Sequence, residues 1–299
     1  MPDIPLAFVE QYSSILNHLA QQRMPRFEGT LEVFDVHGKT RYIEQLGASI
    51  ATPVTTRTSP TPQITPDFER RALFVQPYQT SELIDDFDHI GLLIDPTSEL
   101  ARNQIYSLNR AKDLQIINAA LGTAYTGVNG TTAVTLPSSQ LVANNYTASG
   151  TATSTNLTLA KLGKTRQILL SNEAIEPGEQ LYMAVNSKQL EGLLVNVDQV
   201  ANYLYNQVKT LVDGNVDSFY GFKFVRTEQL PLDSTGNYRA CFAWAKSGLA
   251  LGIGEGLKTR VDIRPDLSHA IQVRTTQVFG ATRLEEKKVV QINCDETNI

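Results

Sequence analysis

The sequence has few residues of several kinds, and each scarcity excludes a class of protein. Cysteine occurs only at Cys241 and Cys294, too few for a disulfide framework or a structural zinc site. No run approaches the ~18 apolar residues of a membrane-spanning helix, and the N-terminus lacks the basic and apolar segments of a secretory signal. Charged residues make up 19% of the chain and hydrophobic residues 41%. These values predict a protein of a reducing compartment, outside the membrane, with a buried core.

An excess of positive charge is also missing. The chain of 299 residues has 26 Lys and Arg against 31 Asp and Glu, which gives a net charge of −5. Because no global positive field attracts nucleic acid, any contact with it is expected to be local. The length is sufficient for two domains or for one larger unit.

The spacing of apolar residues predicts one long helix over residues 95–122. Asp95-Pro96 supplies an N-cap acid and a proline at the first helical position, Glu99 lies in the first turn, and Gly122 follows the last apolar residue. At 1.5 Å per residue, such a helix is about 40 Å long. Shorter helices are expected over residues 6–24, 157–170 and 187–195.

Most other ordered segments have the composition of strands. Two β-prone runs on either side of His37-Gly38 predict a hairpin over residues 31–43. Because helices and strands do not alternate as βαβ units, we expect the α+β class. Further strands are expected at residues 72–76, 181–185, 222–226, 241–245, 249–253, 270–274 and 289–292.

Two segments have a composition unsuited to a core. Residues 51–66 hold four prolines and a single charge, Arg57, which predicts an extended arm or loop. Residues 126–158 are mostly Thr, Ser, Asn and Gly, with no charged residue. They predict a surface β-meander or a long loop inserted between helices.

The candidate catalytic and binding motifs are weak. Asp85, Asp86, Asp88 and His89 are chemically able to hold a divalent cation, but no second acidic or histidine motif accompanies them, so an acidic turn is the favoured interpretation. Glycines at 252, 254 and 256 have the wrong spacing for a dinucleotide loop and predict a turn. No GxSxG motif or Cys–His pairing is present. We therefore expect no catalytic site, metal or cofactor, and surfaces that neighbouring subunits cover.

The order of these elements resembles that of tailed-bacteriophage major capsid proteins with the HK97-type fold, over nearly the whole chain. Residues 211–231 contain Gly214 and the pair Tyr220-Gly221 and look like the axial-domain signature of that family. Residues 277–292 contain Gly280 and look like the peripheral-domain hairpin that ends these proteins. The glycines expected at structural turns are Gly38, Gly122, Gly214, Gly221 and Gly280.

The resemblance implies a division of the chain into an arm, a loop and two domains. The peripheral domain would contain the long helix, called the spine helix in this family, at residues 95–122 and a polar insertion at residues 126–158. The implied ranges are an N-terminal arm at 1–30, an extended loop at 31–80, a peripheral domain at 81–185 and 258–299, and an axial domain at 186–257.

The resemblance also implies function and partners. The chain would self-assemble into hexamers and pentamers of an icosahedral virion shell, put together in the host cytoplasm around double-stranded DNA that is packaged without sequence readout. Because only about 30 residues precede the loop, a separate scaffolding protein is expected, together with a portal and no membrane partner. Whether a decoration protein binds stays open.

Pairs of charges between subunits are a further hypothesis. Charge reversal at Arg70 and Arg71 is expected to lower assembly more than the stability of the subunit. The proposed basic members are Arg57, Arg70 and Arg71, and the proposed acidic partners on a neighbour are Asp85, Asp86, Glu285 and Glu286.

Two alternatives remain open. An encapsulin, the shell protein of a bacterial nanocompartment with the same fold, begins with a helix, as residues 6–24 are predicted to do. The proline-rich arm and the insertion at 126–158 favour a virion. The other alternative is a metal-dependent enzyme that uses the acidic cluster at Asp85, Asp86, Asp88 and His89.

Overall fold

The computed structural model contains both helices and strands throughout, which confirms the α+β class. The chain divides into two compact units. The smaller comprises Met1–Pro25, Pro77–Ala111 and Glu255–Val278, and the larger Arg26–Gln76, Lys112–Gly254 and Phe279–Ile299. The structure describes residues 19–57, 61, 63–84, 97–148, 150–195, 218–233 and 236–297.

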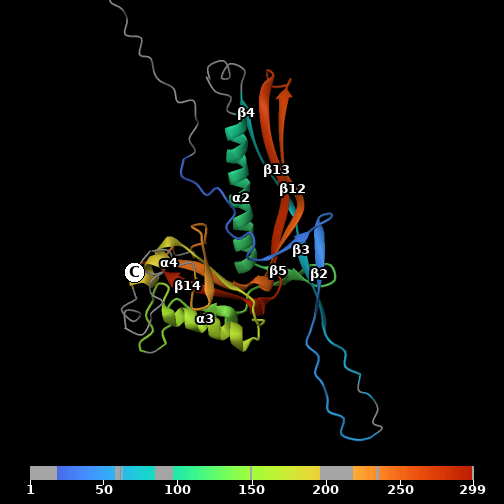
Figure 1. Ribbon diagram of the computed structural model, residues 1–299, viewed down its shortest axis with the longest axis vertical. Helices are drawn as coiled ribbons and strands as arrows, with labels where there is room; N and C mark the ends of the chain where they lie inside the picture. The colour runs from blue at the N-terminus through green and yellow to red at the C-terminus, as the bar shows by residue number, and fades with distance from the viewer. Residues whose placement is uncertain are drawn as a thin grey trace, which may run out of the picture. The chain divides into compact units, whose positions relative to one another are not determined.

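A six-stranded sheet with the order β7-β14-β11-β8-β10-β9 forms the centre of the larger unit (Figure 1). Strand β8 is buried along its whole length, as its apolar sequence predicts, and lies parallel to β10 and antiparallel to β11. The bounds are β7 (Leu141–Val142), β8 (Leu181–Val185), β9 (Ser218–Phe219), β10 (Phe222–Arg226), β11 (Tyr238–Ala245) and β14 (Val289–Asp295).

Aromatic side chains fill the core beside this sheet. Trp244 of β11 is fully buried, and its ring centroid lies 4.9 Å from that of Phe242 and 5.7 Å from that of Tyr182. Phe27 packs on the same side, 5.6 Å from Trp244. The indole Nε1 donates to the carbonyl oxygen of Thr30 at 2.9 Å, so the one polar atom of the ring is satisfied inside the core.

Two helices accompany the sheet. Helix α3 (Leu159–Ser171) begins at Thr158, whose Oγ1 accepts a hydrogen bond from the Lys161 amide, as an N-cap does. Helix α4 (Ser187–Val195) begins after Asn186. Both predicted helices are therefore confirmed, with starts shifted by no more than two residues.

A separate four-stranded antiparallel sheet, β2-β3-β5-β6, also belongs to the larger unit. Its strands are β2 (Thr40–Leu46), β3 (Phe68–Phe74), β5 (Ala124–Thr126) and β6 (Thr132–Val134). Strands β2 and β3 pair along their full length, from Thr40 opposite Phe74 to Leu46 opposite Phe68. The described residues between these two strands form a long loop (Figure 1).

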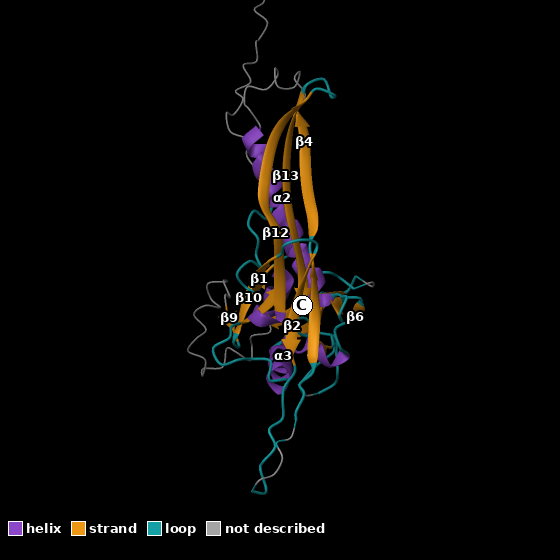
Figure 2. Ribbon diagram, turned by 90° about the vertical axis from the view of Figure 1, so that its right-hand side faces the viewer, coloured by secondary structure: helices purple, strands orange, loops and turns teal. Residues whose placement is uncertain are grey.

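The third sheet has the order β1-β12-β13-β4. Its strands are β1 (Glu32–Asp35), β4 (Gln76–Ile84), β12 (Leu249–Arg264) and β13 (Ala270–Arg283). In the smaller unit, β12, β13 and β4 run alongside the first part of helix α2 (Thr97–Leu121) (Figure 2). Gln104 of α2 is buried there and donates to the carbonyl oxygen of Val273 at 2.9 Å.

The long helix is confirmed in type and extent. Helix α2 has 25 residues with Glu99 in its first turn, and Gly122 follows it directly. The Gly122 amide still donates to the carbonyl oxygen of Asn118 at 2.8 Å. The predicted cap at Asp95-Pro96 lies outside the described residues.

The hairpin predicted at residues 31–43 is wrong. The chain does turn at Gly38, which has a φ of +104°, but the strands on either side of it join different sheets. Strand β1 pairs in parallel with residues 250–253 of β12, whereas β2 pairs with β3. A glycine turn shows that the chain changes direction, but burial of distant partners decides which sheet edge each strand joins.

Two predictions near the C-terminus are also corrected. Residues 277–292 do not form a hairpin, because β13 pairs with β12 and β14 pairs with β11. Gly252, Gly254 and Gly256 form no turn and lie inside β12. A Cβ at Gly252 would lie 2.9 Å from side-chain atoms of both Leu73 and Val36, so close packing favours glycine there.

The remaining predictions differ in outcome. Most of the helix expected at residues 6–24 lies outside the described residues, and residues 19–24 are not helical. The polar segment 126–158 is largely irregular, as expected, but it is not wholly a surface element. Its strands β6 and β7 join two different sheets, and Val142 and Leu157 reach the core.

Candidate functional site

The loop between β2 and β3, residues 47–67, is exposed at nearly all of its described residues. The Gly47 amide donates to the carbonyl oxygen of Asp67 at 2.7 Å and closes the base of the loop. The described residues beyond this base form no helix or strand. Ile50 and Val54 are 77% and 79% exposed, so the loop presents apolar side chains to solvent.

The two adjacent arginines on β3 have different environments because successive strand residues point to opposite faces. Arg70 is partly exposed, and its Nη2 lies 2.6 Å from Glu44 Oε1. The Arg71 side chain is only 3% exposed, and its Nη2 donates to Glu286 Oε2 at 2.9 Å. The ion pair that we assigned to a neighbouring subunit is thus made within the chain for Arg71. Arg70 also has a partner within the chain, Glu44, but part of its side chain stays exposed.

Arg71 belongs to a buried cluster with Arg283 and Glu286. Arg283 is fully buried, and its guanidinium donates to the carbonyl oxygens of Ala120, Gly122 and Val134 at 2.8–3.1 Å. Burial lowers the pKa of Arg283, Glu286 opposes this effect, and the nearby Arg71 lowers the pKa further. The Nε and Nη1 atoms of Arg71 have no hydrogen-bond partner among the described residues.

This cluster anchors several elements at one point. Arg283 is the last residue of β13, and Ala120 and Gly122 lie at the end of α2, where carbonyl groups lack partners within the helix. Val134 ends β6, and Glu286 begins the short helix η4 (Glu286–Lys288). One carboxylate serves two buried guanidinium groups, so the cluster has an excess of positive charge.

The other predicted inter-subunit residues have mixed outcomes. Arg57 lies exposed in the loop, and Glu285 lies 3.8 Å from Lys288 of the same chain. Asp85 and Asp86 lie outside the described residues. Pairing of these charges across subunits stays a prediction.

The predicted turn glycines also differ in outcome. Gly38 and Gly221 have positive φ angles at turns, whereas Gly214 lies outside the described residues. Gly122 ends a helix. Gly280 is not at a turn, because it lies inside β13, where a Cβ would come within 1.8 Å of the Phe74 carbonyl oxygen. Close approach of two backbones requires glycine there.

No metal site is found in the part of the chain that the structure describes, where no group of three His, Cys, Asp or Glu residues is placed to hold an ion. The acidic cluster at Asp85, Asp86, Asp88 and His89 lies outside that part. None of the described helices is long and apolar enough to span a bilayer.

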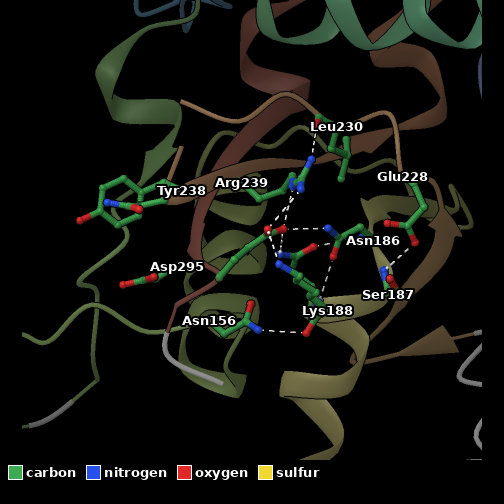
Figure 3. A network of polar contacts seen from close by, with 12 residues as sticks. Asn156, Asn186, Ser187, Lys188, Glu228, Leu230, Tyr238, Arg239 and Asp295 are labelled. Atoms are coloured by element: carbon green, nitrogen blue, oxygen red, sulfur yellow. Dashed lines mark hydrogen bonds and ion pairs between the residues drawn. The ribbon is translucent and has the colours of Figure 1, made fainter. Parts of the chain in front are cut away.

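A second polar network joins Glu296, the residue after β14, to Asn186, Lys188 and Arg239, which are labelled in Figure 3. Its carboxylate accepts hydrogen bonds from Arg239 Nε at 2.7 Å, Asn186 Nδ2 at 2.8 Å, and Gln189 Nε2 and Lys188 Nζ, both at 3.2 Å. Burial alone would raise the pKa of Glu296, but these donors outweigh it and lower the pKa to about 2. The network ties the C-terminal segment to β11 and to the start of α4.

Sequence reasoning missed both Arg283 and Glu296. Neither residue belongs to a motif that predicts a site. Asn186 and Gln189 do carry a local signal, because their spacing is that of a capping box. The backbone N–H of Asn186 donates to Gln189 Oε1, and the backbone N–H of Gln189 donates to Asn186 Oδ1.

Comparisons with known proteins give a family and a fold. The model of a family described as phage capsid protein matches residues 4–296. A search of curated protein sequences found no match. Among solved structures, the capsid of cyanophage P-SCSP1u aligns with a TM-score of 0.72 at 15% identity and covers 96% of this chain and 92% of that one.

Two further solved structures show the same fold. The cyanophage Pam1 capsid aligns over 99% of both chains at 15% identity, with a TM-score of 0.69. The capsid of Ralstonia phage GP4 aligns over 97% of this chain and 96% of that one at 11% identity, with a TM-score of 0.71. The chain belongs to the phage capsid protein family and is a major capsid protein with the HK97-type fold, which forms the shell of a phage head.

Proposed function

We propose that this protein assembles as hexamers and pentamers into an icosahedral virion shell around a double-stranded DNA genome. The observation that carries the proposal is the exposure of Ile50 and Val54 on the loop 47–67. A chain that stayed monomeric would leave these apolar side chains in water. In a closed shell, symmetry lets many individually weak contacts of this kind act together.

The proposed parts of the subunit follow the resemblance. Residues 1–30 form the arm, 31–80 the extended loop, 81–185 and 258–299 the peripheral domain, and 186–257 the axial domain. Strand β14 pairs with β11, and β8 pairs with both β10 and β11, so the six-stranded sheet contains strands of both proposed domains.

The proposed partners are a separate scaffolding protein, a portal and packaged DNA, and assembly takes place in the host cytoplasm. The net charge of −5 supports packaging without tight binding, because a negative subunit does not clamp a negative genome. A decoration protein is a further candidate partner.

We further propose that the protein is not an enzyme. A surface hollow of about 540 Å³ is lined by α3 and Tyr220. Its one aliphatic hydroxyl, Ser171 Oγ, donates to the carbonyl oxygen of Ile168 at 2.9 Å, and no histidine or carboxylate that could act as a base lines the hollow.

Electron microscopy of the purified protein, alone and co-expressed with candidate scaffolding proteins, tests the proposal. We expect closed shells that become uniform in size when the scaffold is present. Shells that enclose a folded enzyme cargo would instead support the encapsulin alternative. A protein that stays monomeric under every condition would contradict assembly, and metal-dependent turnover by those monomers would favour the enzyme.

A further inference from the structure

The surface hollow of about 540 Å³ beside helix α3 has the composition of a binding site. Its volume lies within the roughly 300–1,000 Å³ of sites that hold ligands. Tyr220 and Leu170 are 44% and 55% exposed, so an aromatic ring and an aliphatic side chain meet solvent there beside the guanidinium of Arg166. The hollow is lined by Gly163, Arg166, Gln167, Leu170, Ser171 and Tyr220.

Tyr220 has a strained backbone conformation. Strands β9 and β10 pair with Phe219 opposite Phe222, so Tyr220 and Gly221 form a two-residue turn between them. Their φ angles are +53° and +86°. A turn with two positive φ angles favours Asn, Asp or Gly at its first position, and a bulky side chain there is an outlier. Such strain is typical of functional sites, and here it brings the Tyr220 side chain to the hollow.

Arg166 holds this turn against helix α3. Its Nη1 donates to the carbonyl oxygen of Tyr220 at 3.2 Å, and its guanidinium lies 5.5 Å from the centroid of the Tyr220 ring. A Cβ at Gly221 would lie 3.3 Å from Arg166 Nη1, so glycine lets the turn approach the guanidinium closely. The wall of the hollow that Tyr220 and Arg166 form is therefore fixed before a ligand binds, which lowers the entropy cost of binding.

The hollow offers hydrogen-bond donors but no acid. Arg166 is its one charged lining residue, and in the described part of the chain its guanidinium donates to a carbonyl oxygen and to no carboxylate. Gln167 Oε1 accepts from Lys164 Nζ at 3.2 Å, which leaves Gln167 Nε2 as a further donor. Residues 114–172 contain no Asp or Glu. A carboxylate from outside the chain is the group that fits beside Arg166.

These features favour a ligand that combines a carboxylate with an apolar group. The apolar group would cover Leu170 and the Tyr220 ring, which are otherwise exposed. Nucleic acid is a poor match, because its binding uses several Lys and Arg residues and one lines the hollow. A free small molecule is also a poor match, since Arg166, Gln167 and Leu170 are themselves exposed and such an open surface buries little of a small ligand. A peptide segment of a larger protein fits both requirements.

We propose that the hollow binds an acidic peptide segment of a different protein, with a carboxylate on Arg166 and an aromatic or aliphatic neighbour on Tyr220 and Leu170. A stable contact between two subunits buries about 800 Å² on each partner, far more than this hollow offers. In a shell, many copies of the hollow can act together on a partner that carries several such segments. Only this last step rests on the proposed function, because a single chain already presents the hollow.

A library of short random peptides, selected for binding to the unassembled chain, tests the proposal. We expect enrichment of peptides in which Asp or Glu lies next to an aromatic or aliphatic residue. A synthetic copy of an enriched peptide is then titrated into the chain and into its variants by calorimetry. Replacement of its acidic residues by Asn or Gln should weaken binding at least about tenfold, which corresponds to ~1.4 kcal/mol.

Two substitutions in the hollow, each with a control of the same residue type, locate the bound peptide. Arg166→Gln and Leu170→Glu should each weaken binding at least about tenfold, or ~1.4 kcal/mol. Arg166→Gln also removes the hydrogen bond to the turn, so Leu170→Glu, at an exposed position, separates binding from stability. The controls Arg226→Gln and Leu46→Glu, at exposed positions that do not line the hollow, should bind the peptide as the unsubstituted chain does.

Several results would overturn the inference. One is a library without enrichment, and another is an enriched peptide that binds Leu170→Glu as tightly as the unsubstituted chain. A short DNA duplex that binds instead, and binds more weakly to Leu170→Glu, would assign the hollow to nucleic acid. A photoreactive residue at position 170 that captures a second copy of the chain in assembled shells would assign it to a contact between subunits. Failure of the chain to form shells would contradict the proposed function and leave peptide binding intact.

Discussion

Arg239 and Glu296 form a two-point ion pair, in which Arg239 Nε donates to Oε1 at 2.7 Å and Nη2 donates to Oε2 at 3.1 Å. The pair is mostly shielded from solvent. Such planar, charge-assisted pairs are the stronger hydrogen bonds of proteins. The Arg239–Glu296 pair connects the C-terminal segment to β11. Lys188 and Asn186, at the start of α4, bind the same carboxylate.

Glu296→Gln should lower the free energy of unfolding at pH 7 by on the order of 2 kcal/mol. The folded-state pKa lies below the ordinary value of 4.5, at about 2, so the stabilisation is present above pH 4.5 and is lost as the pH falls towards 2. Urea unfolding of the unsubstituted chain and of Glu296→Gln should show that the difference between their free energies of unfolding becomes smaller as the pH falls through this range. The control Glu191→Gln, at an exposed position on α4, should leave the free energy of unfolding at pH 7 nearly unchanged.

Glu286→Gln should destabilise the subunit more than Arg71→Met does. Removal of Glu286 leaves Arg71 and Arg283 buried without a carboxylate, which should cost about 3–5 kcal/mol. Removal of Arg71 leaves Arg283 paired with Glu286, so we expect the free energy of unfolding to fall by only about 1 kcal/mol. Chemical denaturation of the unassembled subunit measures both. A larger loss for Arg71→Met would show that Arg71 contributes mainly through its own contacts.

Gly280→Ala should destabilise the subunit by at least about 2 kcal/mol. The new Cβ would overlap the Phe74 carbonyl oxygen, and neither backbone can move without disturbing β13 or β3. The control is Gly256→Ala on β12, where no atom lies within 4 Å of the added carbon. In thermal unfolding, the Gly256→Ala control should keep the melting temperature of the unsubstituted chain. Similar melting temperatures for the two variants would contradict this account of Gly280.

Phe27→Ala should lower the free energy of unfolding by about 3–5 kcal/mol. It should also shift the tryptophan emission to longer wavelength. Phe27 is fully buried against Trp244, the only tryptophan of the chain. Loss of the ring opens space for water beside the indole. Phe68→Ala, at an exposed position, is the matched control and should change neither the emission nor the stability of the subunit. An unchanged emission in Phe27→Ala would place the two rings apart in solution.

Local patterns in the sequence were sufficient for the regular elements. The three-and-four spacing from Ala101 to Leu121 and the apolar run Leu181–Val185 depend on nearby residues alone, and α2 and β8 follow them. The composition of residues 51–66 likewise excluded regular structure, because proline removes the hydrogen-bond donors that a strand or helix needs.

The pairing of strands did not follow from local patterns. Gly38 marks a turn, but the partners of the flanking strands come from residues 250–253 and 68–74, far along the chain. Gly280 was assigned to a turn for the same reason, since a glycine signal does not distinguish a turn from a backbone that another strand approaches.

Charge roles were decided by tertiary structure as well. Arg70 and Arg71 are neighbours in sequence, yet one lies at the surface and the other is buried with Glu286. Glu296 gave no signal, because its partners come from two segments far away in the sequence, the start of α4 and strand β11. Helices α2, α3 and α4, strand β8, the exposed loop and the family resemblance could be predicted, because they depend on local spacing and element order. The sheet partners and the charged networks could not, because they depend on which distant residues share a buried surface.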